Sequence, residues 1–307
     1  MVECKKREVD MNYYDEIKSK LIDNEIYSKV KDYSKERNRV ITYFEIGRLL
    51  NEAGSKYGLN IIDEYSKKLV KEVGKKYNRR TLFRMKQFYN VFRNEKVSPV
   101  ATQLTWSHYT ELLSIKDKNK LLYYLNISRN LNLSRNDLRN RIKNKEYERL
   151  PKETKNKLII KKKSEIKDLI KNPIIIKNRH NYESISEKTL QQLILEDIPS
   201  FLDELGEGFT FVRNEYKIKL GDRFNYIDLL LFNYKYNCFV VVELKVTELK
   251  KEYIGQIKLY MNYIDKCVKN IKQDRTIGII ICKKGNDFVM EYCSDDRIFD
   301  TIYTLKN

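Results

Sequence analysis

The amino-acid sequence predicts a mainly helical N-terminal domain followed by a mixed α/β domain whose elements run in the order αβββαββ. Apolar residues recur every three or four positions over residues 13–144, which is the spacing of amphipathic helices. From residue 186 onward, short runs rich in Val, Ile and Leu alternate with helical patterns, as in α/β domains. A lysine-rich stretch separates the two patterns. We therefore expect a helical domain at residues 1–150, a linker at 151–180 and the α/β domain at 181–307.

Four periodic segments predict helices in the N-terminal domain, at residues 13–33, 40–58, 61–77 and 134–150. Gly54 and Gly58 favour the end of the second segment. Ser134 is a preferred N-cap residue at the start of the fourth segment, which ends before Pro151. The linker that follows is either a solvated connector or a further contact for DNA.

The α/β domain begins with a helix, for which Ser186 is a preferred N-cap residue and Gly206 favours the end. Strands are predicted at residues 209–220, 225–232, 238–246, 276–282 and, more weakly, 287–293. A helix is predicted at residues 251–271. This order gives a mixed sheet in which a hairpin is joined to further strands by a crossover helix.

The charge balance favours a polyanionic partner, and nucleic acid is the commonest one. The chain has 61 Lys and Arg residues against 43 Asp and Glu residues, a net charge of +18. An AT-rich genome also enriches Lys, so charge alone does not decide the function. The five cysteines contain no CxxC motif, and those at 238 and 282 are predicted to be core residues. With only two histidines, we expect no structural zinc site.

No apolar segment approaches the length of a membrane span, and the N-terminal residues lack a signal-peptide core. The scattered cysteines fit a reducing compartment. We therefore expect a cytoplasmic protein without a membrane segment or a small-molecule cofactor.

An unusually apolar hairpin at residues 226–245 carries three charged residues, although buried charges are normally paired or bind a metal. If its turn is centred on residues 235–236, the numbers of paired residues sum to 471. Asp228 then lies opposite Glu243, and position 226 lies opposite Lys245. Opposed carboxylates about 5 Å apart repel each other unless a cation neutralises them.

Mg²⁺ is commonly held by one or two carboxylates together with waters and a substrate phosphate. Lys245 points to the same side of its strand as Glu243, where it would orient a water or stabilise charge on a phosphate. A partly exposed charge cluster without a function is the alternative interpretation.

The order of an acid, an apolar hairpin and Glu-X-Lys resembles the signature of the PDDEXK nuclease superfamily. Gln256 and Tyr260, four residues apart on one helix face, resemble its QxxxY element. The segments "FLDELGEGFTFV", "YIDLLLF", "VVVELKV", "EYIGQIKLYMNYID" and "TIGIIIC" together resemble YhcG-type bacterial PDDEXK nuclease proteins. The segments "YFEIGRLLNE", "LTWSHYTELLSI" and "NRRTLFRMKQFY" resemble the helical N-terminal domain of that family.

This resemblance implies a restriction-endonuclease-like fold and metal-dependent hydrolysis of DNA phosphodiester bonds, with Mg²⁺ as the cofactor and Mn²⁺ as a substitute. It assigns the metal ligands to Asp228, Glu243 and the backbone carbonyl of Leu244. Lys245 would act on the attacking water. The residues that would border the substrate phosphate are Gln256 and Tyr260. A homodimer or a complex with a partner protein is left open.

The first helix of the α/β domain departs from the family pattern. The family is expected to have a Leu-Glu pair where this chain has Leu190 and Gln191, and an amide is a poor metal ligand. Glu187, one turn earlier, and Glu196 are the candidates to replace that acid. The departure leaves a second function open, a non-catalytic DNA-binding or assembly subunit built on a nuclease fold.

Residues 78–93 combine basic and aromatic residues and are a candidate DNA-binding helix. Its candidate phosphate contacts are Arg79, Arg80, Arg84 and Lys86. A solvated basic face is the alternative, and residues 134–145 form a second basic segment. Trp106 and His108 are expected to be structural.

Overall fold

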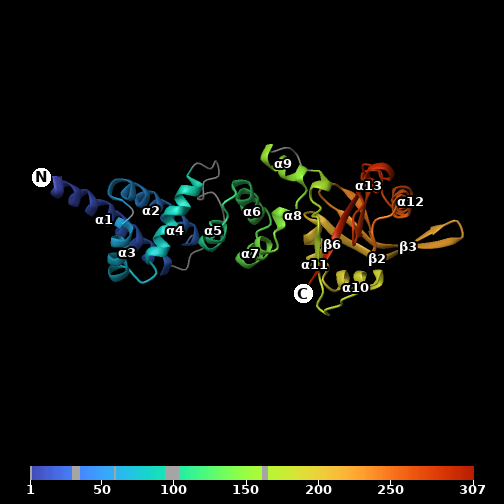
Figure 1. The fold of residues 1–307 in the computed structure, drawn as a ribbon, viewed down its shortest axis with the longest axis horizontal. Coiled ribbons are helices and arrows are strands. Elements are labelled where there is room, and N and C mark those ends of the chain that lie inside the picture. The colour runs from blue at the N-terminus through green and yellow to red at the C-terminus, as the bar shows by residue number, and fades with distance from the viewer. Residues whose placement is uncertain (1, 30–34, 59, 94–103, 161–164) are drawn as a thin grey trace. The chain divides into compact units, whose positions relative to one another are not determined.

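The structure is a computed structural model that describes residues 2–29, 35–58, 60–93, 104–160 and 165–307. The chain folds into two compact units, Met1–Tyr147 and Glu148–Asn307, which we call unit 1 and unit 2 (Figure 1). Among the residues that are described, no helix is both long enough and apolar enough to cross a membrane.

Unit 1 is helical, as the sequence predicts. Its described helices are α1 (Val2–Lys29), α2 (Lys35–Tyr57), α3 (Asn60–Glu72), α4 (Arg79–Phe92), α5 (Trp106–Leu112), α6 (Lys118–Asn130) and α7 (Arg135–Lys143). A short helix, α8 (Glu146–Arg149), spans the boundary between the units. Ser134 caps α7 as expected, because its hydroxyl accepts a hydrogen bond from the amide of Asp137.

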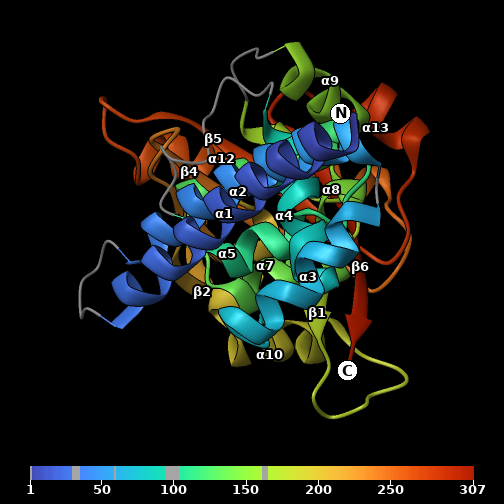
Figure 2. The same cartoon turned by 90° about the vertical axis from the view of Figure 1, so that its left-hand side faces the viewer.

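Helix α4 joins two apolar cores in unit 1. Leu82 and Met85 pack in a core with α1, α2 and α3, whereas Phe88 and Phe92 pack in a second core with α5, α6 and α7. Gly47 allows α2 to lie close against α4, since a Cβ atom there would stand 2.2 Å from a backbone oxygen of α4. Figure 2, which looks onto unit 1, shows α1 and α2 side by side.

Trp106 and His108 are structural, as predicted. The Trp106 ring lies edge-on against Tyr43 and Phe88, with ring centroids 5.0 and 5.4 Å away. His108 is buried, and its Nε2 lies 2.9 Å from the carbonyl oxygen of Leu133. Both residues therefore stabilise the packing of unit 1.

Unit 2 is a six-stranded mixed sheet with helices on both faces. Its strands are β1 (Ile174–Lys177), β2 (Phe209–Leu220), β3 (Arg223–Asn233), β4 (Cys238–Leu244), β5 (Asp274–Cys282) and β6 (Ile298–Lys306). Its helices are α9 (Lys152–Ile160), the 3-10 turn η2 (Ile166–Asp168), α10 (Glu187–Glu196), α11 (Ile198–Leu205), α12 (Lys251–Cys267) and α13 (Asp287–Cys293). The strand order is β1-β6-β5-β4-β3-β2, with β2, β3 and β4 antiparallel and the other pairs parallel.

The two faces of the sheet carry separate cores. On one face, α10 and α11 cover alternate residues of the strands, among them Leu229, Val240 and Val242. On the other face, α12 packs against Val241 and Ile280. Cys238 and Cys282 are buried in these cores, as predicted. The sheet thus has the mixed α/β architecture that the sequence predicts.

Three elements of unit 2 differ from the prediction. Residues 287–293 form the helix α13 and not a strand, because Asn286 caps the segment and a run of seven residues fits either state. The last strand is β6, which the periodicity did not indicate. The first helix is divided at Asp197, whose side chain caps α11.

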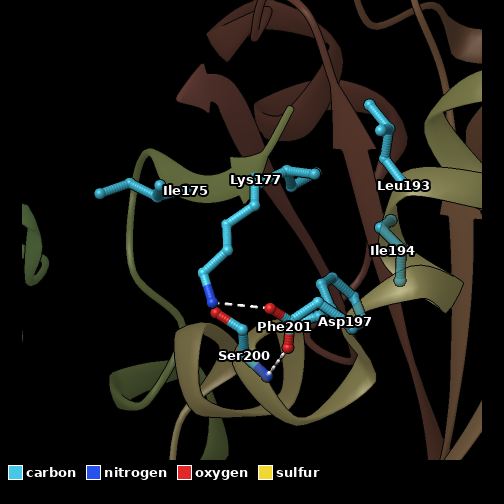
Figure 3. Close-up of a pocket in the computed structure, with 8 residues that line it drawn as sticks. Ile175, Lys177, Leu193, Ile194, Asp197, Ser200 and Phe201 are labelled. Atoms are coloured by element: carbon cyan, nitrogen blue, oxygen red, sulfur yellow. Dashed lines mark hydrogen bonds and ion pairs between the residues drawn. The ribbon is translucent and has the colours of Figure 1, made fainter. Parts of the chain in front are cut away.

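The segment predicted as a linker contributes to unit 2, since β1 lies within it and pairs with β6. Lys177 of β1 pairs with Asp197 at 2.6 Å, and Asp197 also accepts a hydrogen bond from the Ser200 amide (Figure 3). The small pocket between β1 and the α10–α11 pair is lined mostly by apolar side chains. Its two charged residues are therefore engaged with each other, and they hold β1 against the helices.

Candidate active site

The β3–β4 hairpin has the register that the sequence predicts. The paired residues run from Leu229–Val242 to Asn233–Cys238, and their numbers sum to 471. The next position in this register places Asp228 opposite Glu243. The Asp228 carboxylate lies against β4, because its Oδ2 accepts a hydrogen bond of 2.8 Å from the backbone amide of Leu244. The expected pairing of position 226 with Lys245 lies beyond this ladder.

Glu243 and Lys245 are buried charges at the end of a central strand. Only 2% of Glu243 and 7% of Lys245 is exposed. Glu243 lies in a central strand flanked by β3 and β5, which accounts for its burial. Lys245 Nζ lies 2.9 Å from Glu243 Oε1 and 3.3 Å from Glu187 Oε2. It also lies 5.1 Å from the centroid of the Tyr253 ring. One ammonium group therefore balances two carboxylates from different elements.

The charge of this cluster is incompletely neutralised. Burial and the neighbouring Asp228 raise the pKa of Glu243 from 4.5 to about 7, although Lys245 opposes the shift. Burial also raises the pKa of Asp228, against the opposing effect of the Leu244 amide. Burial lowers the pKa of Lys245, but Glu243, Glu187 and Asp228 together attract its proton strongly enough to raise that pKa. Glu243 Oε2 is buried without a hydrogen-bond partner, so one acceptor of the cluster is unsatisfied.

Helix α12 places Tyr260 near the carboxylates and Gln256 beside Tyr260. The two residues stand four apart on one helix face, and Gln256 Nε2 donates a hydrogen bond of 3.0 Å to the Tyr260 hydroxyl. Burial raises the pKa of Tyr260, and the charges of Glu243 and Asp228 act in the same direction. The Tyr260 hydroxyl thus lies within electrostatic range of the two carboxylates.

Helix α10 brings Glu187 to the cluster but not Glu196. Glu196 lies nine residues further along, which is about 13.5 Å along a helix axis. Its carboxylate instead contacts the Nε2 atom of His180 at 3.0 Å. Of the two candidates for the missing acid, Glu187 therefore contacts the cluster, and Glu196 contacts His180. Gln191 is buried, and its Nε2 donates a hydrogen bond of 3.0 Å to the backbone oxygen of Asp228.

A further carboxylate, Glu215 of β2, was missed by the sequence analysis. The pairs Asn214–Leu229 and Tyr216–Ile227 place Glu215 opposite Asp228 on the side away from β4. Its φ angle of 46° is uncommon for a residue with a side chain, and its charge contributes to the raised pKa of Asp228. The turn after residue 220 could have revealed it, because that turn fixes the register of β2 on β3.

The donor set fits a hard divalent cation whose coordination is completed by other ligands. Asp228 and Glu243 offer carboxylate oxygens on adjacent strands, and Glu243 Oε2 lacks a partner. Over the described residues, no three His, Cys, Asp or Glu side chains form a cluster that could hold a metal by themselves. Mg²⁺ is compatible with two carboxylates because it retains waters and binds substrate phosphates. The candidate ligand Leu244 lies between Glu243 and Lys245 at the end of β4.

The predicted DNA-binding residues lie on α4 in unit 1. Arg79 pairs with Asp63, and its guanidinium lies 4.7 Å from the Phe83 ring centroid. Arg80 is exposed, whereas Arg84 and Lys86 are half-buried. The apolar side of α4 is buried in the two cores of unit 1, so its basic residues lie on the remaining surface.

Comparisons with known proteins agree with this architecture. Residues 167–304 match the family model described as the YhcG PDDEXK nuclease domain, and residues 21–149 match the DUF1016 N-terminal domain. The curated protein "Putative nuclease YhcG" of Escherichia coli (strain K12) is 23% identical to the chain over 287 residues. That similarity covers 80% of this chain and 76% of the E. coli protein.

Two solved structures show weaker similarity. A repair endonuclease from Pyrococcus abyssi has a TM-score of 0.28 and 19% identity, over 40% of this chain and 48% of that one. A complex described as "EndoMS-dsDNA2" has a TM-score of 0.28 and 17% identity, over 42% of this chain and 48% of that one. The chain thus spans about half the length of each. On the two family matches, the chain consists of a DUF1016 N-terminal domain followed by a PDDEXK nuclease domain of the YhcG type.

Proposed function

We propose that the protein is a metal-dependent deoxyribonuclease that hydrolyses DNA phosphodiester bonds. The observation that carries the proposal is the buried cluster of Asp228, Glu243 and Lys245, in which Glu243 has an unpaired oxygen and a raised pKa. Natural folds seldom retain such a cluster for stability, because buried charge that is incompletely paired is costly. A site that binds a cation and a phosphate accounts for the cost.

The cation would be Mg²⁺, with Mn²⁺ as a substitute, held by Asp228, Glu243 and the Leu244 carbonyl. When bound, it would neutralise the carboxylates and stabilise negative charge on the phosphate. Glu187 is the candidate for an additional acidic group, since it reaches the cluster through Lys245. In this role Glu187 would replace the acid that the family resemblance implies at position 191.

Lys245 is positioned to act on the attacking water or on the phosphate. Its ammonium remains charged because Glu243 and Glu187 both attract the proton. It therefore donates hydrogen bonds and cannot serve as a base in this state. Tyr260 accepts a hydrogen bond from Gln256, which leaves the Tyr260 hydroxyl proton available for a phosphate oxygen. This pair would border the scissile phosphate.

A second function, a non-catalytic DNA-binding subunit, is favoured by one observation. Gln191 stands where the family resemblance implies an acid, and it donates a hydrogen bond to a backbone carbonyl, as a structural residue would. Without a sufficient substitute for that acid, the cluster would bind DNA or a cation without cleaving.

A cleavage assay separates the two functions. The full chain is incubated with linear, circular, branched and single-stranded DNA in Mg²⁺, Mn²⁺ or EDTA. Asp228→Asn, Glu243→Gln and Lys245→Ala should each reduce cleavage by orders of magnitude. Glu248→Gln, which removes an exposed partner of Lys284, is the matched control and should cleave normally. If the chain binds DNA but shows no metal-dependent cleavage of any of these substrates, the non-catalytic function is established instead.

A further inference from the structure

A two-stranded extension of β2 and β3 reaches beyond the rest of the sheet. Strand β4 pairs with β3 only from Leu229 onward, whereas β2 stays paired with β3 as far as Leu220 and Arg223. Residues 216–227 therefore form a hairpin that is flanked by no further strand, and we call it the β2–β3 arm. Figure 1 shows it projecting from unit 2.

The two faces of the β2–β3 arm differ in character. Ile218 and Ile227 are buried in the core beneath α12, so one face is anchored. The pairs Lys217–Tyr226 and Lys219–Phe224 place four side chains together on the opposite face. Tyr226 is 52% exposed and Phe224 is 53% exposed, and both lysines are exposed. The outward face is thus a fixed surface of two cations and two rings.

The geometry of this face suits a nucleic acid. Lys217 Nζ lies 3.8 Å from the Phe224 ring centroid, so the arm itself orders one of the two cations. Asp222, the acidic residue of the arm, lies in its turn and not in either pair. Ordered lysines can contact phosphates, and a two-stranded ribbon is narrow enough for the major groove of B-DNA.

The arm also leads directly to the candidate metal ligands. Tyr226 lies two residues before Asp228 on the same strand, which is about 7 Å. Phe224 lies four residues before Asp228 on β3, and Lys219 is its partner on β2. The separation along the strand is about 13 Å, or roughly four base-pair steps of DNA. A duplex that contacts the outward face would therefore come within a few base-pair steps of Asp228.

We propose that the outward face of the β2–β3 arm is a docking surface for the DNA duplex that the site cleaves, with Lys217 and Lys219 as its phosphate contacts. The proposal rests on the proposed nuclease function. It assigns part of the DNA affinity to unit 2, in addition to any contribution from α4 in unit 1.

The test measures the affinity of the full chain for a labelled duplex in EDTA, where cleavage is suppressed, over a range of salt concentrations. The variant Lys217→Gln with Lys219→Gln removes both charges and retains side-chain length at exposed positions. Each lost phosphate contact should reduce by about 0.9 the slope of the logarithm of affinity against the logarithm of salt concentration. With 1 M salt as the reference, this change corresponds to a loss of affinity of about 5.5-fold at 0.15 M salt. The double variant should therefore bind up to about 30-fold more weakly, with a slope reduced by about 1.8.

Lys266→Gln with Lys272→Gln is the matched control. Both residues are exposed, and they flank the connection to Asp274, which pairs with Cys238 at the end of β4 remote from Glu243. This control should bind DNA almost as tightly as the native protein. If the arm variant retains native affinity and slope, or if the control loses as much, the docking surface is refuted. Phe224→Ala with Tyr226→Ala should also weaken binding, which provides a second check that does not depend on charge.

The same experiment distinguishes failure of this inference from failure of the proposed function. Native affinity in the arm variant, together with metal-dependent cleavage by the native chain, would refute the arm alone. Weakened binding by the arm variant, with no cleavage by the native chain, would refute the nuclease function and retain the docking surface for the non-catalytic alternative.

Discussion

Replacing Glu243 with glutamine should stabilise the metal-free protein while it abolishes cleavage. Burial and Asp228 raise the pKa of Glu243 from 4.5 to about 7. Between these values the folded protein keeps a proton that the unfolded chain releases, so stability falls as pH rises through this range. Each pKa unit corresponds to about 1.4 kcal/mol, so ionisation of Glu243 costs about 3 kcal/mol at pH 8 and almost nothing at pH 4.5.

Glu243→Gln removes this cost because the amide is neutral at every pH. In EDTA, the variant should exceed the native protein in free energy of unfolding by about 3 kcal/mol at pH 8, and the difference should vanish toward pH 4.5. Under the proposed function Mg²⁺ would bind the native carboxylates, and it should therefore reduce the difference. At a concentration 100-fold above its Kd, it adds about 2.7 kcal/mol to the native protein.

Urea unfolding measures these differences for each unit. The single tryptophan, Trp106, lies in unit 1, so its fluorescence reports unit 1 and serves as an internal control. Circular dichroism reports the unfolding of both units. An unfolding transition that is seen by circular dichroism but not by Trp106 fluorescence therefore belongs to unit 2. Glu248→Gln, which removes an exposed ion pair worth up to about 1 kcal/mol, should give no gain. Equal stability of Glu243→Gln and the native protein at pH 8 in EDTA would refute the raised pKa of this carboxylate.

Two further predictions concern α4 and α10. Arg80→Ala with Arg84→Ala should weaken DNA binding and flatten its salt dependence by up to about two units of slope; native affinity and slope would show that α4 is not a DNA anchor. Gln191→Glu should lower the stability of unit 2 by about 1–3 kcal/mol, because an ionised carboxylate cannot donate to the Asp228 carbonyl. Unfolding in urea checks this, and an unchanged stability would contradict the structural role of the Gln191 amide.

The sequence alone determined the parts of the site that depend on neighbouring residues. The turn after residue 233 set the register that brings Asp228 beside Glu243, and strand alternation related Glu243 to Lys245. Helical spacing placed Gln256 and Tyr260 on one face. These relations are local or follow from one tight turn, so backbone geometry fixes them before the chain packs.

Only the tertiary structure decided which distant groups join the cluster. Glu187 and Glu196 were both candidates by sequence, and the packing of α10 brings Glu187 to Lys245 and leaves Glu196 with His180. The same packing gives Gln191 its backbone partner. These contacts join residues of different elements, so they depend on how a helix lies across the sheet.

The two ends of the sheet were decided in the same way. Strand β1, inside the predicted linker, exists because β6 pairs with it from the far end of the chain. Residues 287–293 form a helix because Asn286 caps them and because β5 takes β6 as its neighbour. A short apolar run fits a strand or a helix equally well, and the choice between them comes from the neighbours it meets in space and not from its own periodicity.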